Sequence, residues 1–274
     1  MKGTYMNFET EATRSLERIT AEQPLIHQIT NVVVTNDSAN LTLGFGALPV
    51  MAYAPEEVAE MAAMSQALVL NIGTLSAGEV EAMVIAGRSA ADHGVPIVLD
   101  PVGAGATRFR TESVLRLLSE LPVTVLRGNR GEIGALVGSG QVRGVEAVGT
   151  EDPRSVAEAA VERFGVVTAV TGAVDVIVGD GRVLEVVNGH PLLGRITGSG
   201  CMATVSIGIF LTAGEDTVLQ TALALAVYGL AAERASSGDP GPGTFRSRLL
   251  DEVAAASNKG VVGLRVSEAN NGRS

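Results

Sequence analysis

Short, almost continuous apolar runs recur along this chain, and they constrain its fold more than any other feature. The four clearest runs are residues 67–72, 96–99, 123–126 and 166–170. A run without polar alternation is typical of a strand buried on both faces of a parallel sheet. Segments with helical periodicity flank the runs, at residues 55–65, 77–93, 111–120 and 152–164. The alternation predicts an α/β fold with a mainly parallel central sheet and helices on both faces.

Residues 174–187 carry a different signal. The sequence Gly-Asp-Gly at 179–181 lies between two alternating segments, a pattern typical of a β-hairpin. We therefore expect an antiparallel hairpin at one edge of the sheet. Because no stretch rich in Pro, Gly or Ser divides the chain, residues 1–274 are predicted to form a single domain.

The composition narrows the choice of partner and compartment. The net charge is −10 and no basic run occurs, so nucleic acids and anionic membranes are poor candidates. Cys201 is the only cysteine, which excludes an internal disulfide and fits the cytoplasm. The N-terminus lacks the apolar core of a signal peptide. Residues 217–235 are strongly apolar, but Gln220, Glu233 and Arg234 interrupt them, which favours a buried helix over a membrane span.

Polar residues and glycines follow each apolar run at once. These segments are Asn71-Ile-Gly73, Asp100-Pro-Val-Gly103, Arg127-Gly-Asn129 and Thr171-Gly172. In open α/β sheets, ligands bind beyond the carboxyl ends of the strands. The repeated placement therefore predicts a ligand site at that edge of the sheet.

Residues 197–201 read Thr-Gly-Ser-Gly-Cys and lead into an apolar segment that ends at residue 213. Two glycines permit a tight turn into a buried helix, whose first N–H groups lack intrahelical partners and carry partial positive charge. Such a turn binds anions and places Cys201 beside them. A thiol at a helix N-terminus tends toward thiolate, although a nearby phosphate opposes this. A phosphate cradle with a proton-accepting group beside it indicates phosphoryl transfer.

Lysine usage limits the kind of phosphate site. The chain contains only Lys2 and Lys259, and no Gly-Lys-Ser/Thr sequence. A P-loop is therefore excluded, and a Schiff-base lysine is improbable. A phosphate site in this chain has to rely on backbone N–H groups, arginine and a metal ion.

Four residues at the strand ends each have both a functional and a structural interpretation. Asp100 can hold Mg²⁺, usually through water, or cap the next turn. Asn129 and Glu132 have the spacing of a helix capping box, and Glu132 is also a candidate to lie near metal and phosphate. Arg127 is either a solvated surface charge or a phosphate clamp, and a clamp suits a chain with so little lysine.

Residues 198–203 also match the G-x-G-x-x-A dinucleotide fingerprint. The match is weak because that fingerprint follows the first buried strand, whereas residues 189–195 are loop-like. A Rossmann-type oxidoreductase is thus one alternative. A non-catalytic nucleotide-binding regulator on the same fold is another, and Asp100, Glu132 and Cys201 argue against it.

Several segments that together span most of the chain resemble the hydroxyethylthiazole kinase family of the ribokinase-like superfamily. They are residues 27–36 (HQITNVVVTN), 49–53 (PVMAY), 70–75 (LNIGTL), 99–107 (LDPVGAGAT), 127–129 with Glu132, 171–172, 197–201 and 241–245 (GPGTF). Each segment alone is unspecific, but the combination is specific. The resemblance implies a ribokinase-like kinase that uses ATP and Mg²⁺ to phosphorylate 4-methyl-5-(2-hydroxyethyl)thiazole for thiamine diphosphate biosynthesis and salvage.

The resemblance also implies a role for individual residues. The sets are Met51, Gly198 and Asn31 for the thiazole alcohol, Cys201 for catalysis, Arg127, Thr171, Asn129, Ser199 and Gly200 for ATP, and Asp100 and Glu132 for Mg²⁺. The family is typically a homotrimer with sites at subunit interfaces. Much of the superfamily has aspartate at the position of Cys201. The cysteine in this chain matches the thiazole kinase branch, and this difference argues against a sugar or pyrimidine kinase. The alternative is a kinase for another small alcohol, such as hydroxymethylpyrimidine, or an ATP-dependent dehydratase.

Overall fold

Four neighbouring strands in the central sheet account for the apolar runs. The computed structural model describes residues 7–138, 141–143, 146–148 and 152–269. The runs form β3 (Ala67–Asn71), β4 (Ile97–Asp100), β5 (Val125–Asn129) and β8 (Val167–Thr171), side by side and parallel as predicted. Asn71 pairs with Asp100, and Asn129 with Thr171, so the polar strand ends share one edge of the sheet.

The sheet extends beyond these strands on both sides. β1 (Leu25–Ile29) pairs with β3, and β2 (Leu48–Val50) is the outer parallel strand. The order of the nine strands is β11-β10-β9-β8-β5-β4-β3-β1-β2. His27 lies inside β1. The buried side chains of His27 and Gln28 break the apolar run that would have revealed this strand.

The hairpin expected at residues 174–187 is present as β9 (Asp175–Gly179) and β10 (Arg182–Val186). β9 is antiparallel to both β8 and β10. A distant segment, β11 (Val266–Glu268), then adds to β10 and forms the edge of the sheet. β6 (Gln141–Arg143) and β7 (Glu146–Val148) form a separate two-stranded sheet.

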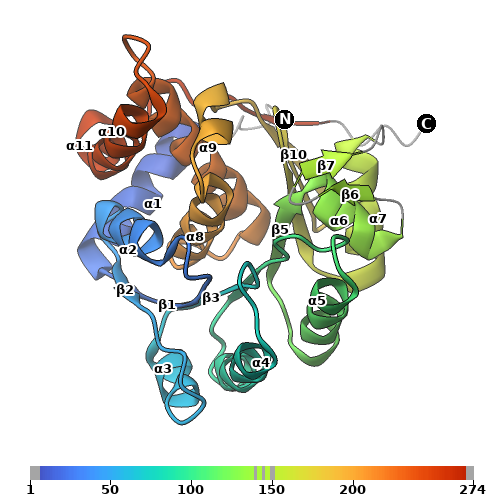
Figure 1. Ribbon diagram of the computed structural model, residues 1–274. Helices are drawn as coiled ribbons and strands as arrows, with labels where there is room; N and C mark the ends of the chain where they lie inside the picture. The colour runs from blue at the N-terminus through green and yellow to red at the C-terminus, as the bar shows by residue number, and fades with distance from the viewer. Residues whose placement is uncertain (1–6, 139–140, 144–145, 149–151, 270–274) are drawn as a thin grey trace, which may run out of the picture.

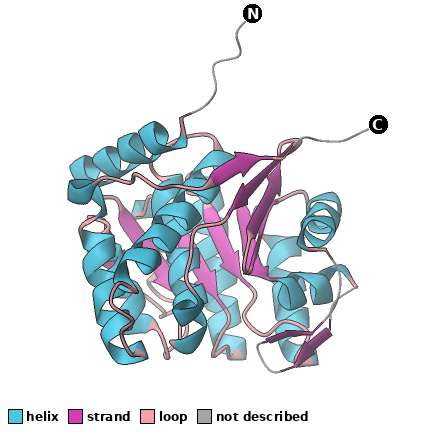
Figure 2. Cartoon of the chain, turned by 90° about the horizontal axis from the view of Figure 1, so that it is seen from above, coloured by secondary structure: helices cyan, strands magenta, loops and turns pink. Residues whose placement is uncertain are grey.

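Helices cover both faces of the central sheet, as Figure 1 shows along the strands and Figure 2 from above. One apolar core joins the sheet to α1 (Phe8–Glu22), α2 (Thr35–Gly44), α8 (Ser199–Leu211), α9 (Thr217–Ala235), α10 (Pro242–Ala254) and α11 (Ala256–Lys259). The other core joins it to α3 (Val58–Met64), α4 (Ala77–Asp92), α5 (Arg108–Glu120), α6 (Arg130–Val137) and α7 (Pro153–Phe164).

The two most apolar helices lie in the centre of the first core. α8 begins at the predicted glycine turn, directly after a short 3₁₀ helix, Pro191–Arg195. α9 packs against it, and most of its residues are buried, as expected for a core helix. Among the described helices, none combines the length and the apolarity that crossing a membrane requires.

Candidate functional site

Asp100 is the centre of a polar network at the carboxyl edge of the sheet. Its Oδ2 atom accepts hydrogen bonds from Asn71 Nδ2 at 3.0 Å and from Thr204 Oγ1 of α8 at 2.8 Å. A guanidinium nitrogen of Arg127 lies 3.7 Å from the same oxygen. The other oxygen, Oδ1, is buried and has no hydrogen-bond partner among the described residues. The carboxylate is thus fixed through one oxygen, while the other retains its capacity to bind a ligand.

Arg127 is buried beneath the start of α8, so it is not a solvated surface charge. Its side chain donates to Thr171 Oγ1 at 2.5 Å, and only 8% of the residue is exposed. The guanidinium approaches Gly200 so closely that a Cβ atom at Gly200 would lie 2.9 Å from an Arg127 nitrogen. Because Gly200 has no Cβ atom, the guanidinium lies directly against the first turn of α8.

The glycine turn begins α8 as predicted. Gly198 is the N-cap residue, with a φ of 85° that L side chains rarely adopt. A Cβ atom at this position would also overlap the side chain of Val34. Tyr228 of α9 donates to the carbonyl of Ser199 at 3.0 Å. Backbone conformation, close packing and this hydrogen bond together hold the first N–H groups of α8 toward the strand ends.

Cys201 lies in the first turn of α8 and contacts Asn31. Asn31 Nδ2 is 3.4 Å from the sulfur and also donates to Asn71 Oδ1 at 2.8 Å. Burial, reinforced by the charge of Asp100, raises the pKa of the thiol to about 11. The expected tendency toward thiolate is therefore wrong for the unliganded protein, because desolvation and a neighbouring carboxylate outweigh the helix N-terminus. Cys201 is a protonated thiol at neutral pH.

Asn129 and Glu132 form the predicted capping box at the start of α6. Glu132 accepts from the backbone N–H of Asn129 at 2.9 Å, and Asn129 Oδ1 accepts from the N–H of Glu132 at 3.0 Å. The other carboxylate oxygen of Glu132 accepts from the N–H of Gly103 at 2.8 Å. Glu132 thereby joins the loop after β4 to the end of β5.

The two carboxylates of the site lie close enough to influence each other. Burial raises the pKa of Asp100, and burial together with the Asp100 charge raises the pKa of Glu132 to about 7. Among the described residues, no group of three or more His, Cys, Asp or Glu could hold a metal. Mg²⁺ commonly uses only one or two carboxylates, with water and substrate phosphates as its other ligands. The orphaned Oδ1 of Asp100 fits such an ion.

Met51 lies apart from this network. It directly follows β2, near the edge of the sheet, and its neighbour Ala52 accepts a hydrogen bond from His27 Nε2 at 2.9 Å. The predicted site residues therefore lie in two places. Most of them belong to the polar network at the strand ends, namely Asn31, Asp100, Arg127, Asn129, Glu132, Thr171, Cys201 and the α8 turn. No described hydrogen bond or ion pair connects Met51 to this network.

Thr204 is a site residue that the sequence analysis missed. It is fully buried and lies one turn after Gly200. A polar residue four positions into an apolar helix lies on the same helix face as the glycine turn, which was the available signal. Tyr228 left no such signal, because α9 is distant in sequence.

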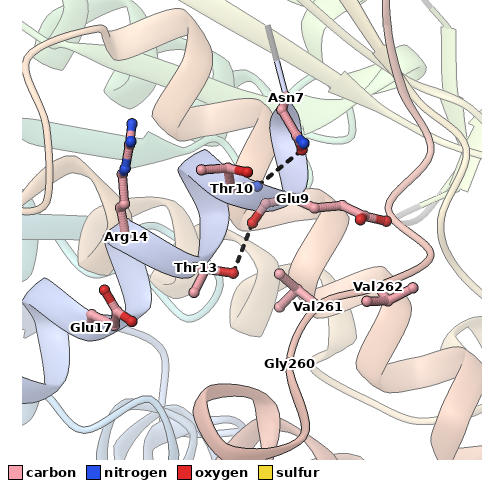
Figure 3. A pocket seen from close by; sticks show the side chains of 9 residues that line it. All are labelled: Asn7, Glu9, Thr10, Thr13, Arg14, Glu17, Gly260, Val261 and Val262. Atoms are coloured by element: carbon pink, nitrogen blue, oxygen red, sulfur yellow. Dashed lines mark hydrogen bonds between the residues drawn. The ribbon is translucent and has the colours of Figure 1, made fainter.

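The surface cavities of the described residues include one of about 740 Å³ and one of about 420 Å³. The larger opens beside Thr171 and Asn129, two of the predicted ATP-binding residues. It is lined further by Arg130, Asp152, Pro153, Arg154, Gly172, Ala173, Val174, Val176 and Glu185. The smaller lies between α1 and residues 260–262 (Figure 3) and shares no residue with the polar network.

Comparisons with known proteins identify relatives of this chain. Residues 16–259 match the model of the hydroxyethylthiazole kinase family. Hydroxyethylthiazole kinase from Desulforudis audaxviator is 55% identical over 241 residues, 87% of this chain and 88% of that protein. The one from Methanosphaerula palustris is 52% identical over 243 residues, 88% of this chain and 92% of that protein.

Solved structures show the same relationship. The hydroxyethylthiazole kinase structure from Pyrococcus horikoshii OT3 superposes with a TM-score of 0.87 at 42% identity, covering 95% of this chain and all of the other. Pyridoxal kinase from Staphylococcus aureus reaches a TM-score of 0.62 at 15% identity, covering 90% of this chain and 99% of the other. The second likeness concerns the fold alone.

Proposed function

Because this chain belongs to the hydroxyethylthiazole kinase family, we propose that it transfers the γ-phosphoryl group of ATP to the hydroxyl of 4-methyl-5-(2-hydroxyethyl)thiazole. The product is the thiazole phosphate used to make thiamine diphosphate. The observation that carries this proposal is the asymmetry of Asp100. Its Oδ2 accepts two hydrogen bonds and lies 3.7 Å from Arg127, whereas Oδ1 has no hydrogen-bond partner among the described residues.

The phosphate side of the reaction is assigned to the α8 turn and its neighbours. Backbone N–H groups of Ser199 and Gly200 and the guanidinium of Arg127 bind the transferred phosphoryl group, since each supplies fixed positive charge. Thr171 and Asn129 lie at the mouth of the larger cavity, which suits the rest of ATP. Asp100 and Glu132 would hold Mg²⁺, which neutralises charge on the phosphates.

The alcohol side is assigned to Cys201, Asn31, Gly198 and Met51. Cys201 and Asn31 are in contact, so both reach a hydroxyl placed at the first turn of α8. With its pKa raised to about 11 by burial, the thiol keeps its proton at neutral pH, so it orients this hydroxyl and does not accept its proton. A loose phosphoryl-transfer transition state needs little deprotonation of the nucleophile, so orientation is the useful contribution.

The substrate is tested with a panel of alcohols. Purified protein with Mg-ATP should release ADP with the thiazole alcohol, and mass spectrometry should detect the thiazole phosphate. Turnover of hydroxymethylpyrimidine or a sugar, without turnover of the thiazole, would contradict the assignment. ADP release together with loss of water from the added compound would indicate the dehydratase instead.

Cys201 variants test its orienting role. Cys201→Ala and Cys201→Ser should lower kcat by about 10-fold, below the 10²–10⁴-fold typical of a general base, and leave the KM for ATP nearly unchanged. Cys201→Asp should remain active, because a carboxylate can also accept a hydrogen bond from the alcohol. Melting temperatures of the Ala and Asp variants serve as the control. Full activity of Cys201→Ala, together with poor folding of Cys201→Asp, would show that Cys201 only packs in the core and does not orient the alcohol.

We further propose that the chain assembles as a homotrimer in the cytoplasm. Edge strand β2 lies with α2 and α3 at the left of Figure 1. These segments and the loop after β1 carry exposed apolar side chains. They are Val32, Val33, Leu43, Leu48 and Met64, each more than 40% exposed. Met51 belongs to the same region, so association there would complete a substrate site near it. Isolated exposed apolar residues are common, whereas several together favour an interface.

Sedimentation measures the assembly. We expect a species of three chains, each of 28.1 kDa, at micromolar concentration. Leu43→Glu should dissociate it and raise the KM for the alcohol, because a buried charge opposes association. Val187→Glu is the matched control, since Val187 is equally apolar and 45% exposed but follows β10 in the antiparallel part of the sheet. A wild-type protein that sediments only as a monomer would refute the proposal.

A further inference from the structure

Arg110 occupies a position where helix electrostatics alone disfavour a cation. It lies in the first turn of α5, directly after the N-cap residue Thr107, and that first turn contains no acidic residue. The N-terminus of a helix carries partial positive charge, so an arginine there lowers helix stability slightly. Its neighbour Arg108 points into solvent with 88% of its side chain exposed and pairs with Glu112. Arg110 instead turns inward and is half-buried.

The Arg110 guanidinium donates three hydrogen bonds to backbone carbonyls. One nitrogen bonds the carbonyls of Ile72 at 2.9 Å and Val102 at 2.8 Å, and the other bonds the carbonyl of Gly73 at 2.8 Å. These carbonyls belong to two separate loops, one after β3 and one after β4. A planar donor fork is able to satisfy several acceptors at fixed angles, which an ammonium group does less well. Arg110 therefore clamps the two loops together.

Each clamped loop carries part of the polar network. In the first loop, Gly73 packs so tightly on Asn31 that a Cβ atom at Gly73 would lie 2.6 Å from the Asn31 amide nitrogen. In the second loop, the N–H of Gly103 donates to Glu132. A shift of the first loop would thus move Asn31 away from Cys201, and a shift of the second would move Glu132. Arg127 and Thr171 lie on β5 and β8 and are not held by the clamp.

We propose that Arg110 is a positioning residue. By holding the two loops together, it keeps Asn31, on the alcohol side of the site, and Glu132 at fixed positions relative to each other. This inference rests on the proposed kinase function. It predicts which kinetic constants change. Loss of the clamp should affect the alcohol and the chemical step, while the ATP contacts on β5 and β8 stay in place.

The kinetic test compares Arg110→Met and Arg110→Lys with Arg108→Met, a control on the same helical turn. We expect Arg110→Met to lower kcat/KM for the alcohol by about 10- to 100-fold, the scale of a small misplacement of reacting groups. The KM for ATP should change less than about 2-fold. Arg110→Lys, which keeps the charge and loses the fork, should fall between the wild type and Arg110→Met. Arg108→Met should match the wild type.

A second measurement needs no substrate. Amide hydrogen exchange should be faster at residues 71–75 and 101–106 in Arg110→Met than in Arg108→Met, because the N–H groups of Gly73 and Gly103 are hydrogen-bonded in these loops. Equal losses of activity for alcohol and ATP with unchanged exchange would overturn the inference. A wild type that phosphorylates no alcohol would instead refute the kinase function, while the exchange experiment would still decide the clamp.

Discussion

Asp100→Asn should lower kcat by about 10²- to 10³-fold, the scale of losing one preorganised electrostatic group at a transition state. The amide oxygen still accepts from Asn71 and Thr204, so the network keeps its hydrogen bonds and loses only the charge and the free Oδ1. Steady-state kinetics at varied Mg²⁺ concentration measure the effect, and the concentration needed for half-maximal rate should rise. Asp92→Asn, an exposed position at the end of α4, is the control.

The same substitution has an effect on stability whose sign follows from the pKa of Asp100. Burial raises this pKa above the ordinary value of 3.8, so the folded protein binds the proton more tightly than the unfolded chain. The stabilisation from that proton is fully present below pH 3.8 and is lost as pH rises through the folded pKa. The Tm of unliganded Asp100→Asn relative to wild type should therefore increase as pH rises from about 4 to 7.

An unchanged kcat for Asp100→Asn in a folded protein would contradict the role of Asp100 in the reaction. A relative Tm that is constant with pH would contradict the pKa argument separately. The two outcomes are independent, because one is read with substrates and the other without them.

Arg127→Ala should reduce kcat/KM for ATP by about 10- to 100-fold, since a hydrogen bond to a charged group contributes about 1.5–3 kcal/mol. The KM for the alcohol should change little, because Asn31 and Met51 make no described contact with this side chain. Arg127 also lies 3.7 Å from the buried Asp100 carboxylate, and its loss leaves that charge without a cation. The Tm should fall as well, and fall more at pH 7 than at pH 4.

The control for Arg127→Ala is Arg88→Ala, an arginine that is 63% exposed and pairs with Glu120. Surface ion pairs contribute about 0–1 kcal/mol, so this variant should keep its activity and nearly its Tm. Arg127→Ala with wild-type kinetics for ATP would remove Arg127 from the phosphate site and leave it a structural partner of Asp100 and Thr171.

The sequence predicted the elements whose cause is local. Strands β3, β4, β5 and β8 appeared as apolar runs because both their faces are buried, and the capping box of Asn129 and Glu132 follows from three-residue spacing. The turn at Gly198 was predicted because only a flexible backbone enters a buried helix so sharply. The resemblance to a known family added the roles of the remaining residues, and the family itself was confirmed.

Strands β1, β2 and β11 are not among the apolar runs of the sequence. β1 contains the buried polar side chains His27 and Gln28, which break the apolar pattern. β2 and β11 are three residues long, too short to leave a periodicity. All three become strands because a neighbouring strand offers hydrogen-bond partners, and that neighbour is distant in sequence.

The sequence by itself determined which residues end the strands and where the glycine turn into α8 lies, because these depend on apolar runs and on glycine. Only the tertiary structure decided what each polar residue does at that edge. It buried Arg127 beside Asp100 and gave Oδ1 of that carboxylate no hydrogen-bond partner among the described residues. It kept Cys201 protonated by desolvation and turned Arg110 onto two loops. Burial and the direction of a hydrogen bond depend on segments that meet only when the chain has folded, so no local pattern records them.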